Sequence, residues 1–571
     1  MGTAALKVKH ITTDILIIGG GTAGCMAAIF ARQKAPQIDV AIFEKAHINR
    51  SGCLAMGLNA VNAYLVDSTP EDYLRYVLKD NYDVLRSDLV LSIGKRLNRM
   101  TRLLEEFGVP LPRGEDGKYI PRSARSIVML GEHLKPILAQ TVQAQGVKVF
   151  NRTPAYRLLK SASDGSTAGA VAFNLRTGEF IVARAKAVII ATGGASGIYR
   201  PSNPGLARTK TWYCAYNAGS GLAMGLRAGA EMTSFEMRFV ALRTKDVIAP
   251  TGTLVLGTLM PQCNARGEKY LRAKEDMLGR KLTTCERLLH TIDEHKKGKG
   301  PCYVDVSALS PKQYTDLVES YLNMAPSIIL DLLKDPARPK ERIEVCGSEP
   351  YINGGHGMAG FWIDKNRRTT LAGLYAAGDV AGGSSKKYIT GCFAEAEMAV
   401  EDILQGWGPG VQSDVAQHEE KQAVLELQSP FSTKHDITFN EVEERLQKIM
   451  EEYAGGCTQN YETNRDKLLL ARRYLFALSE RAQQMQAEDM HELMRVHDTA
   501  DRILLARTLV EHMLARKETR WPCYQTRLDY PMRNDFEYKL FINSRVEDNT
   551  ITVFKRELNP PYTPIPLEDN K

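Results

Sequence analysis

The first regular pattern in the chain is a short apolar run that ends in a group of glycines. Residues 14–18 (DILII) are rich in isoleucine, which is typical of a buried parallel strand. Residues 25–33 are compatible with a helix, and residues 39–43 form a second apolar strand that ends at Glu44. The turn between the first strand and the helix has the spacing G-x-G-x-x-G, with Gly19, Gly21 and Gly24. This order of elements predicts a dinucleotide-binding unit.

Each residue of this motif has an expected physical role. Gly19 permits the tight turn, Gly21 lets the backbone approach a pyrophosphate, and Gly24 allows close packing of helix on strand. The free N–H groups and positive dipole end of the helix suit phosphates, and Glu44 can bind ribose hydroxyls. The alternative is a glycine-rich turn in an unrelated sheet, and the motif alone does not specify which dinucleotide is bound.

Helices and strands continue to alternate through the first half of the chain. Residues 70–107 have the apolar spacing of two helices, with a break at residues 81–87. A further helix is expected over residues 131–145. The strands expected after it lie at residues 147–149, 169–175, 179–184 and 187–190. The last strand runs into Ala191, Thr192 and Gly193, which we expect to form a second backbone passage beside the same nucleotide.

The character of the sequence changes after residues 211–229, which are rich in small residues and are expected to form a helix. Residues 231–348 are mixed and carry seven prolines, which indicates an inserted second domain. The dinucleotide fold resumes near residue 349, and the stretch GLYAAGD at 373–379 predicts a strand, a turn and an acid, Asp379. Residues 414–518 are charged and have a helical period.

Together these patterns predict an α/β protein built around a Rossmann-like dinucleotide-binding domain. This domain is expected in two parts, residues 1–235 and 349–410, separated by an inserted domain at 236–348. A helical domain is expected at residues 411–518. Residues 519–571 are expected to be irregular, because they have few helix formers and carry Pro560, Pro561, Pro564 and Pro566.

Composition narrows the function only slightly. The 571 residues are 44% hydrophobic and 25% charged, no apolar run is long enough to span a membrane, and the start of the chain has no export-signal pattern. The ten cysteines form no C-x-x-C pair, which argues against metal on this chain and favours a cytoplasmic location. The net charge of +7 fits either a solvated basic face or an anionic substrate or partner, and the dispersed basic residues argue against nucleic acid.

Four longer stretches carry a resemblance to a known family. They are RSGCLAMGLNAVNAY (50–64), TWYCAYNAGSGLAMGLRAGAEMTSFEMRFVALRTKD (211–246), SEPYINGGHGMAGFW (348–362) and ETRWPCYQTRLDYP (518–531). With the glycine motif, ATGG and YAAGD, they resemble the fumarate reductase/succinate dehydrogenase flavoprotein superfamily. Within it the chain most resembles the alpha subunits of dissimilatory-type adenylylsulfate (APS) reductases. The resemblance implies an FAD-binding Rossmann-like domain with an inserted capping domain and a C-terminal helical domain.

The resemblance also implies how FAD is held. Succinate dehydrogenases tether FAD to a histidine, but the matching segment here reads Arg50-Ser51-Gly52-Cys53, so we expect non-covalent FAD. Asp379 is expected to hold the ribityl chain. The full set of expected cofactor-binding residues is Gly19, Gly21, Thr22, Ala23, Gly24, Glu44, Lys45, Arg50, Ser51, Gly52, Ala191, Thr192, Gly193 and Asp379.

The chemistry implied is reduction of APS to sulfite and AMP through a flavin N5–sulfite adduct, and four residues match the family's active site. Asn62 is expected near the flavin and sulfate, Arg243 to bind sulfate, His356 to face the substrate, and Trp212 to lie against the flavin ring. Three of them have an alternative: Asn62 as a turn cap, Trp212 as a core side chain, and Arg238 in place of Arg243. Cys53 and Cys392 are expected to be small packed side chains.

The electrons are expected to come from another chain. By resemblance, the partner is a ferredoxin-like beta subunit with two [4Fe-4S] clusters, in a hetero-oligomer. The aromatic residues of the C-terminal region either contribute to that interface or wrap their own domain: Trp521, Tyr524, Tyr530, Phe536, Tyr538 and Phe541.

Three functions remain open at this point. The first is an APS reductase alpha subunit, acting on APS or on its 3′-phosphorylated form. The second is a fumarate reductase or succinate dehydrogenase-type flavoprotein that acts on a dicarboxylate, although residues 236–240 (EMRFV) lack the QFHPT-like pattern expected there. The third is a non-catalytic flavin-carrying subunit, against which the presence of Asn62, Arg243 and His356 argues.

Overall fold

The computed structural model describes residues 7–56, 58–123, 125–201, 211, 213–245, 255–324, 341–406, 414–433 and 437–567. Its centre is a seven-stranded sheet in the order β6-β2-β1-β9-β8-β7, with β16 also paired to β9. These strands are β1 (Val8–Ile18), β2 (Val40–Glu44), β6 (Lys148–Asn151), β7 (Ala155–Lys160), β8 (Thr167–Phe173), β9 (Phe180–Ile190) and β16 (Leu374–Ala376). The sheet confirms the predicted Rossmann-like core of an α/β fold.

Strand β9 connects the two halves of this sheet. Its first part, Phe180 to Arg184, pairs antiparallel with β8, whereas its last part, Val188 to Ile190, pairs parallel with β16. Along its length it also runs parallel to β1. The two strands predicted at residues 179–184 and 187–190 are therefore one strand, and its carboxyl end leads directly into the ATGG stretch.

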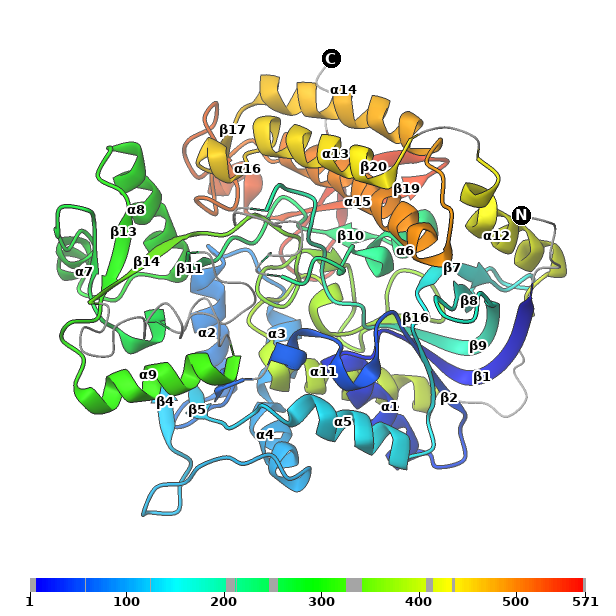
Figure 1. Ribbon diagram of the computed structural model, residues 1–571, viewed down its shortest axis with the longest axis horizontal. Coiled ribbons are helices and arrows are strands. Elements are labelled where there is room, and N and C mark those ends of the chain that lie inside the picture. Colours follow the sequence, from blue (N-terminus) through cyan, green and yellow to red (C-terminus); the bar gives the residue numbers. More distant parts are fainter. Residues whose placement is uncertain are drawn as a thin grey trace.

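The central sheet is covered on both faces. Alternate residues of β1 point to opposite sides, so Ile15 and Ile17 join one buried cluster while Leu16 and Ile18 join another. The first cluster includes α1 (Thr22–Lys34), α5 (Leu134–Ala144) and α11 (Tyr388–Gln405), and the second includes α6 (Ser220–Arg227) and α15 (Met490–Ala515). Figure 1 shows α1, α5 and α11 on one side of the sheet and α15 on the other.

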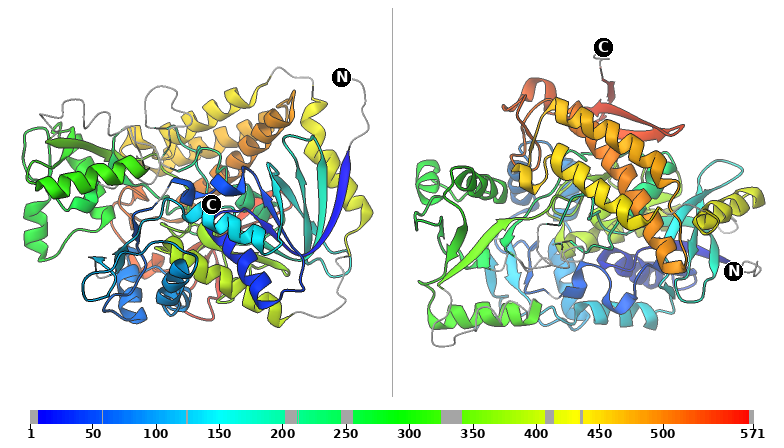
Figure 2. Two further views of the ribbon diagram at one scale, coloured as in Figure 1. Left: turned by 60° about the horizontal axis from the view of Figure 1, so that its bottom comes forward. Right: turned by 45° about the horizontal axis from the view of Figure 1, so that its top comes forward.

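The segment that interrupts this fold forms its own sheet. Four antiparallel strands lie in the order β11-β14-β13-β12, and helices α7, α8 and α9 flank them. The bounds are β11 (Leu242–Thr244), β12 (Gln262–Cys263), β13 (Cys302–Asp305), β14 (Arg342–Gly347), α7 (Arg272–Leu278), α8 (Thr284–Lys296) and α9 (Pro311–Met324). Figure 2 shows these elements, in green, at the end of the molecule opposite to the central sheet.

The segment after residue 413 is mainly helical, as predicted. Helices α13, α14 and α15 pack against one another, and α12 lies on β7 and β8. The bounds are α12 (Gln417–Gln428), α13 (Phe439–Tyr453) and α14 (Arg465–Ala482). Among the described helices, none is long and apolar enough to cross a membrane.

The expectation that residues 519–571 are irregular was wrong. They contain β19 (Phe541–Glu547), β20 (Thr550–Arg556) and β21 (Pro564–Pro566), which join β10 (Met232–Thr233) and β15 (Gly360–Phe361) in a five-stranded sheet. The turn between β19 and β20 consists of Asp548 and Asn549, both with positive φ (47° and 61°), which is the geometry of a two-residue type I′ hairpin. The Asp-Asn pair between two alternating stretches was the signal that favoured a hairpin.

Other boundaries also differ from expectation. The small-residue helix expected at 211–229 is helical only over α6. Residues 70–107 form three helices instead of two: α2 (Pro70–Asp80), α3 (Ser87–Gly94) and α4 (Leu97–Glu106). The remaining short elements are β3 (Ala60–Val61), β4 (Pro121–Ser123), β5 (Ser126–Val128), β17 (Glu462–Thr463), β18 (Thr526–Arg527) and α16 (Asp535–Tyr538).

Candidate active site

The glycine turn after β1 is packed so tightly that side chains are excluded. Gly19 has φ +103°, and a Cβ added there would lie 2.5 Å from the carbonyl oxygen of Ala191. A Cβ on Gly24 would lie 1.8 Å from the carbonyl oxygen of Gly19. The turn, the start of α1 and the ATGG stretch are therefore held against one another by backbone contact, as the motif predicts.

The outer side of the same turn is open. A Cβ on Gly21 would meet only the Cα of Gly52, at 3.8 Å. Helix α1 begins at Thr22, and Gly21 caps it without any side-chain hydrogen bond, so no side chain competes for the first N–H groups. An open strip of backbone at a helix N-terminus fits a pyrophosphate.

Two acidic residues mark the ends of the site. Glu44 is buried, and its carboxylate accepts hydrogen bonds from the backbone N–H of Gly20 and of Ala46, both at 2.7 Å. Asp379 accepts hydrogen bonds from the Tyr213 hydroxyl at 3.2 Å and from Asn353 Nδ2 at 3.1 Å. Both carboxylates are thus fixed in orientation, Glu44 at the end of β2 and Asp379 after β16.

A cavity of about 540 Å³ joins these parts into one site. This volume is in the range of small-molecule and cofactor sites. Eleven of the residues expected to bind the cofactor line it: Gly19, Gly21, Thr22, Ala23, Glu44, Lys45, Gly52, Ala191, Thr192, Gly193 and Asp379.

Three expected cofactor residues do not line the cavity. Gly24 acts through packing under the turn, as its contact with Gly19 shows. Ser51 is buried, and its hydroxyl donates to the Gly20 carbonyl at 3.3 Å. Arg50 is exposed at the end of a short 3₁₀ helix.

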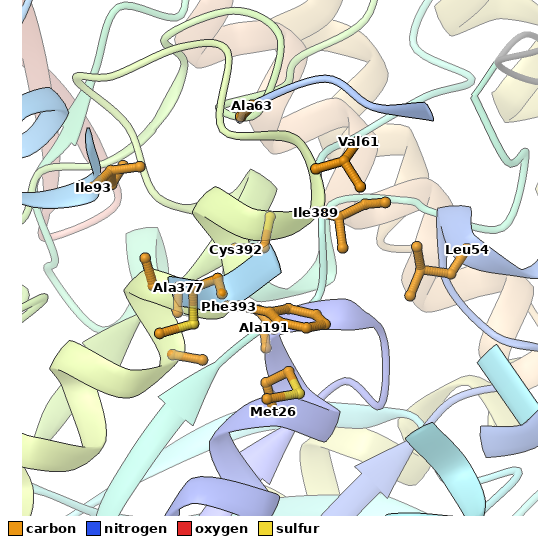
Figure 3. Close-up of a cluster of buried hydrophobic side chains, with 14 of the residues drawn as sticks. Met26, Leu54, Val61, Ala63, Ile93, Ala191, Ala377, Ile389, Cys392 and Phe393 are labelled. Carbon is orange, nitrogen blue, oxygen red and sulfur yellow. The ribbon is translucent and has the colours of Figure 1, made fainter. Parts of the chain in front are cut away.

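The floor of the cavity is apolar. Figure 3 shows Ala191, Ala377, Cys392 and Ile389 in one buried cluster with Phe393, and all but Phe393 also line the cavity. Burial raises the pKa of the Cys392 thiol well above its usual value, and burial likewise raises the pKa of Cys53. Neither thiol is therefore activated as a thiolate, in agreement with the expectation of small packed side chains.

Asn62 and His356 both line the cavity. The His356 ring lies between aromatic neighbours, with ring centroids 5.3 Å from Phe239 and 5.6 Å from Tyr388. Burial lowers the pKa of His356, and the Asp379 carboxylate opposes this shift only in part. His356 is therefore neutral at pH 7 and offers a hydrogen bond in place of a positive charge.

Arg243 lies behind the cavity wall. It is fully buried on β11, and its Nη2 is 3.5 Å from Glu349 Oε2, while its neighbours Ala241 and Leu242 line the cavity. Arg243 itself is not among the residues that line the cavity.

Arg238, the alternative to Arg243, has a structural role. It is fully buried and donates to the carbonyl oxygens of Ala454 (2.6 Å), Tyr524 (2.9 Å), Tyr461 (3.2 Å) and Gly455. Its donors are therefore engaged by backbone. Trp212 lies outside the described residues.

Three cations in the cavity wall were missed by the sequence analysis: Arg122 on β4, Arg287 on α8 and Lys386 before α11. Among the described residues, Arg122 donates to Asn59 Oδ1, at 3.3 Å, and Arg287 to Gln262 Oε1, at 2.8 Å. Within the described part of the chain, no carboxylate lies within ion-pair distance of either guanidinium. Lys386 forms an ion pair with Asp80. No local motif brings these cations together, because they come from three distant segments.

This combination of a glycine turn, fixed acids and an apolar floor defines a dinucleotide-binding flavoprotein. The chain matches the family model described as "FAD binding domain" over residues 14–392, and it belongs to that family. The open glycine strip, Glu44 and Asp379 fit the pyrophosphate, ribose and ribityl parts of FAD.

Within that class the chain is an oxidoreductase of the adenylylsulfate reductase type. It is 29% identical to the adenylylsulfate reductase subunit alpha of Megalodesulfovibrio gigas, over 98% of this chain and 97% of the relative. The adenylylsulfate reductase structure from Archaeoglobus fulgidus shares 32% identity and a TM-score of 0.88, over 99% of this chain and 97% of that one. A structure of adenosine-5-phosphosulfate reductase in complex with sulfite, described as a covalent adduct, has the same identity and coverage and a TM-score of 0.89.

Proposed function

We propose that this chain is the FAD-carrying catalytic subunit that reduces adenylylsulfate to sulfite and AMP. The observation that carries the proposal is the cavity itself: the site for the dinucleotide continues into a wall that holds two arginines without carboxylate partners among the described residues. A cationic wall beside a flavin suits a substrate with a phosphate and a sulfate group. A neutral or cationic small molecule would not be attracted by these positive charges.

Different residues of this chain bind different parts of the cofactor and the substrate. The glycine turn and the N-terminus of α1 hold the pyrophosphate of FAD. Glu44 binds the ribose and Asp379 binds the ribityl chain, and the cofactor is held without a covalent bond to the protein. Bound FAD supplies the two electrons that reduce the sulfur. Since His356 is neutral, it donates a hydrogen bond to the sulfonate or holds a proton. Asn62 contributes a further hydrogen bond through its amide group.

The positive charge that the nucleotide requires is supplied by Arg122 and Arg287. A guanidinium forms paired hydrogen bonds with phosphate oxygens, and here no internal carboxylate competes for either group among the described residues. Arg243 acts from behind the wall, where its pair with Glu349 positions the β11 segment that lines the cavity. The same two arginines could accept a further phosphate, so the 3′-phosphorylated substrate is part of the proposal.

We also propose a partner that supplies electrons. The similar protein of Megalodesulfovibrio gigas is named as a subunit alpha, which implies a second subunit in that enzyme. By the same resemblance, a ferredoxin-like beta subunit with [4Fe-4S] clusters would form a hetero-oligomer with this chain.

The proposal can be tested on the anaerobically purified, FAD-loaded chain with its partner. The rate of ferricyanide reduction is measured with sulfite plus AMP, with sulfite plus adenosine 3′,5′-bisphosphate, and with succinate. We expect sulfite-dependent reduction that requires one of the two nucleotides, and the preferred nucleotide identifies the substrate. Reduction with succinate and none with sulfite plus either nucleotide would show that the proposed function is wrong.

A further inference from the structure

A lysine lies buried directly beneath the glycine turn. Lys135 is the second residue of α5 and is 0% exposed. Its ammonium donates to the carbonyl oxygen of Gly20, and its Nζ is 3.4 Å from Cys25 Sγ. Lys135 does not line the cavity, so any contact with a bound dinucleotide acts through the turn above it.

This position is unfavourable for a cation in two ways. Transfer of an ammonium group from water into a protein interior is strongly unfavourable unless it is paired. The first turn of a helix also carries the positive end of the helix dipole, which repels a positive side chain. In the part of the chain that the structure describes, no carboxylate lies within ion-pair distance of Lys135. Among the described residues, the Lys135 side chain therefore has a backbone carbonyl and a thiol as neighbours but no carboxylate partner.

The peptide group that Lys135 contacts is held from both sides. The N–H of Gly20 donates to Glu44 Oε2 at 2.7 Å, and the carbonyl oxygen of Gly20 accepts from Lys135, from Ser51 Oγ at 3.3 Å and from Cys25 Sγ at 3.2 Å. Gly20 stands between Gly19 and Gly21, which both line the cavity. The orientation of this one peptide thus sets the position of the backbone that faces the pyrophosphate.

We propose that Lys135 is a positioning residue for the FAD pyrophosphate. Its hydrogen bond fixes the Gly20 peptide, and its charge, in a setting of low dielectric constant, attracts the negatively charged pyrophosphate above the turn. The cost of the buried cation is offset when the cofactor binds. This inference concerns retention of FAD and does not depend on which substrate the enzyme reduces.

The test compares Lys135→Met, which removes both charge and hydrogen bond, with Lys135→Gln, which keeps a hydrogen-bond donor. The Kd of FAD is measured by titration of the FAD-free full-length chain, followed by flavin fluorescence, and the melting temperature of the same FAD-free chain is recorded. Lys148→Met is the control, because Lys148 is an exposed lysine on β6 of the central sheet and already pairs with Asp39. We expect both Lys135 variants to weaken FAD binding about tenfold or more. The FAD-free chain should melt at or above the wild-type temperature, since a buried charge has been removed.

Other results would overturn the proposal. Wild-type FAD affinity in Lys135→Met would show that Lys135 has no influence on the cofactor. Wild-type affinity in Lys135→Gln alone would show that the hydrogen bond suffices and that the charge is irrelevant. Weaker FAD binding together with a lower melting temperature of the FAD-free chain would show that Lys135 only supports the fold.

Discussion

Gly24→Ala tests the physical basis of the cofactor site with a single methyl group. A Cβ at this position would lie 1.8 Å from the carbonyl oxygen of Gly19 and 3.0 Å from its carbonyl carbon. Real Cβ atoms do not approach other atoms closer than 3.0 Å, so the turn and α1 must separate by more than about 1 Å. The obstacle is backbone, so no rotation of a side chain can relieve it.

This separation displaces the turn whose residues Gly19 and Gly21 line the cofactor cavity. Overpacking of a tight site costs about 1–3 kcal/mol, and here the strain displaces Gly19, which is itself in contact with Ala191. We therefore expect FAD affinity to fall by about 10–100-fold. The assay is the FAD-to-protein ratio after purification, followed by titration of the FAD-free chain. Gly406→Ala is the control, because Gly406 follows α11 with φ −85° and a Cβ there has no neighbour closer than 3.8 Å. If Gly24→Ala retained full FAD at wild-type affinity, the account of the turn would be refuted.

Three further changes have distinct expected outcomes. In steady-state kinetics, Arg287→Gln should raise the KM for the nucleotide about tenfold or more while FAD is retained. The control Arg280→Gln removes a cation that is already paired with Glu286, and it should leave this KM unchanged. Burial lowers the pKa of His497 to about 4, so below about pH 6.5 the unfolded chain binds a proton that the folded chain does not. The free energy of unfolding should thus fall by up to about 3 kcal/mol as the pH falls toward 4, and His497→Gln should remove this part of the pH dependence in denaturant titrations. Arg238→Met should cost about 4 kcal/mol or more, measured by the same titrations, because it removes the donor to the buried carbonyl oxygens of Tyr524, Gly455 and Tyr461.

The parts of the site that depend on short-range pattern could be predicted from the sequence. Gly19, Gly24 and Glu44 are fixed by the spacing of one strand, one turn and one helix, and this spacing is visible along the chain. The helical region after residue 413 follows from its 3.6-residue period in the same way.

The parts that depend on long-range contacts could not be predicted. Arg122, Arg287 and Lys386 converge only because β4, α8 and the start of α11 fold onto one cavity. Lys135 looks like an ordinary surface lysine in the sequence, and only the packing of α5 buries it under the turn.

The C-terminal hairpin was missed for a different reason. Its Asp-Asn turn is a local signal for a hairpin, whereas the nearby prolines suggest irregular structure. Pro564 and Pro566 lie in the short edge strand β21, and Pro560 and Pro561 lie before it, so none of them interrupts β19 or β20. Burial bears on the two alternatives for the aromatic residues there: Trp521, Tyr524, Tyr538 and Phe541 are core, whereas Phe536 is 98% exposed. Most of these aromatic residues therefore pack within their own chain.

The most direct measurement of the central claim is a sulfite titration of the FAD-loaded protein under anaerobic conditions. If the flavin lies in a cavity arranged to activate a sulfur oxyanion, sulfite should abolish the visible absorbance bands of oxidised FAD in a saturable manner. The same concentrations of sulfate or succinate should leave the spectrum unchanged. An oxidised flavin spectrum that persists at high sulfite concentration would contradict the account.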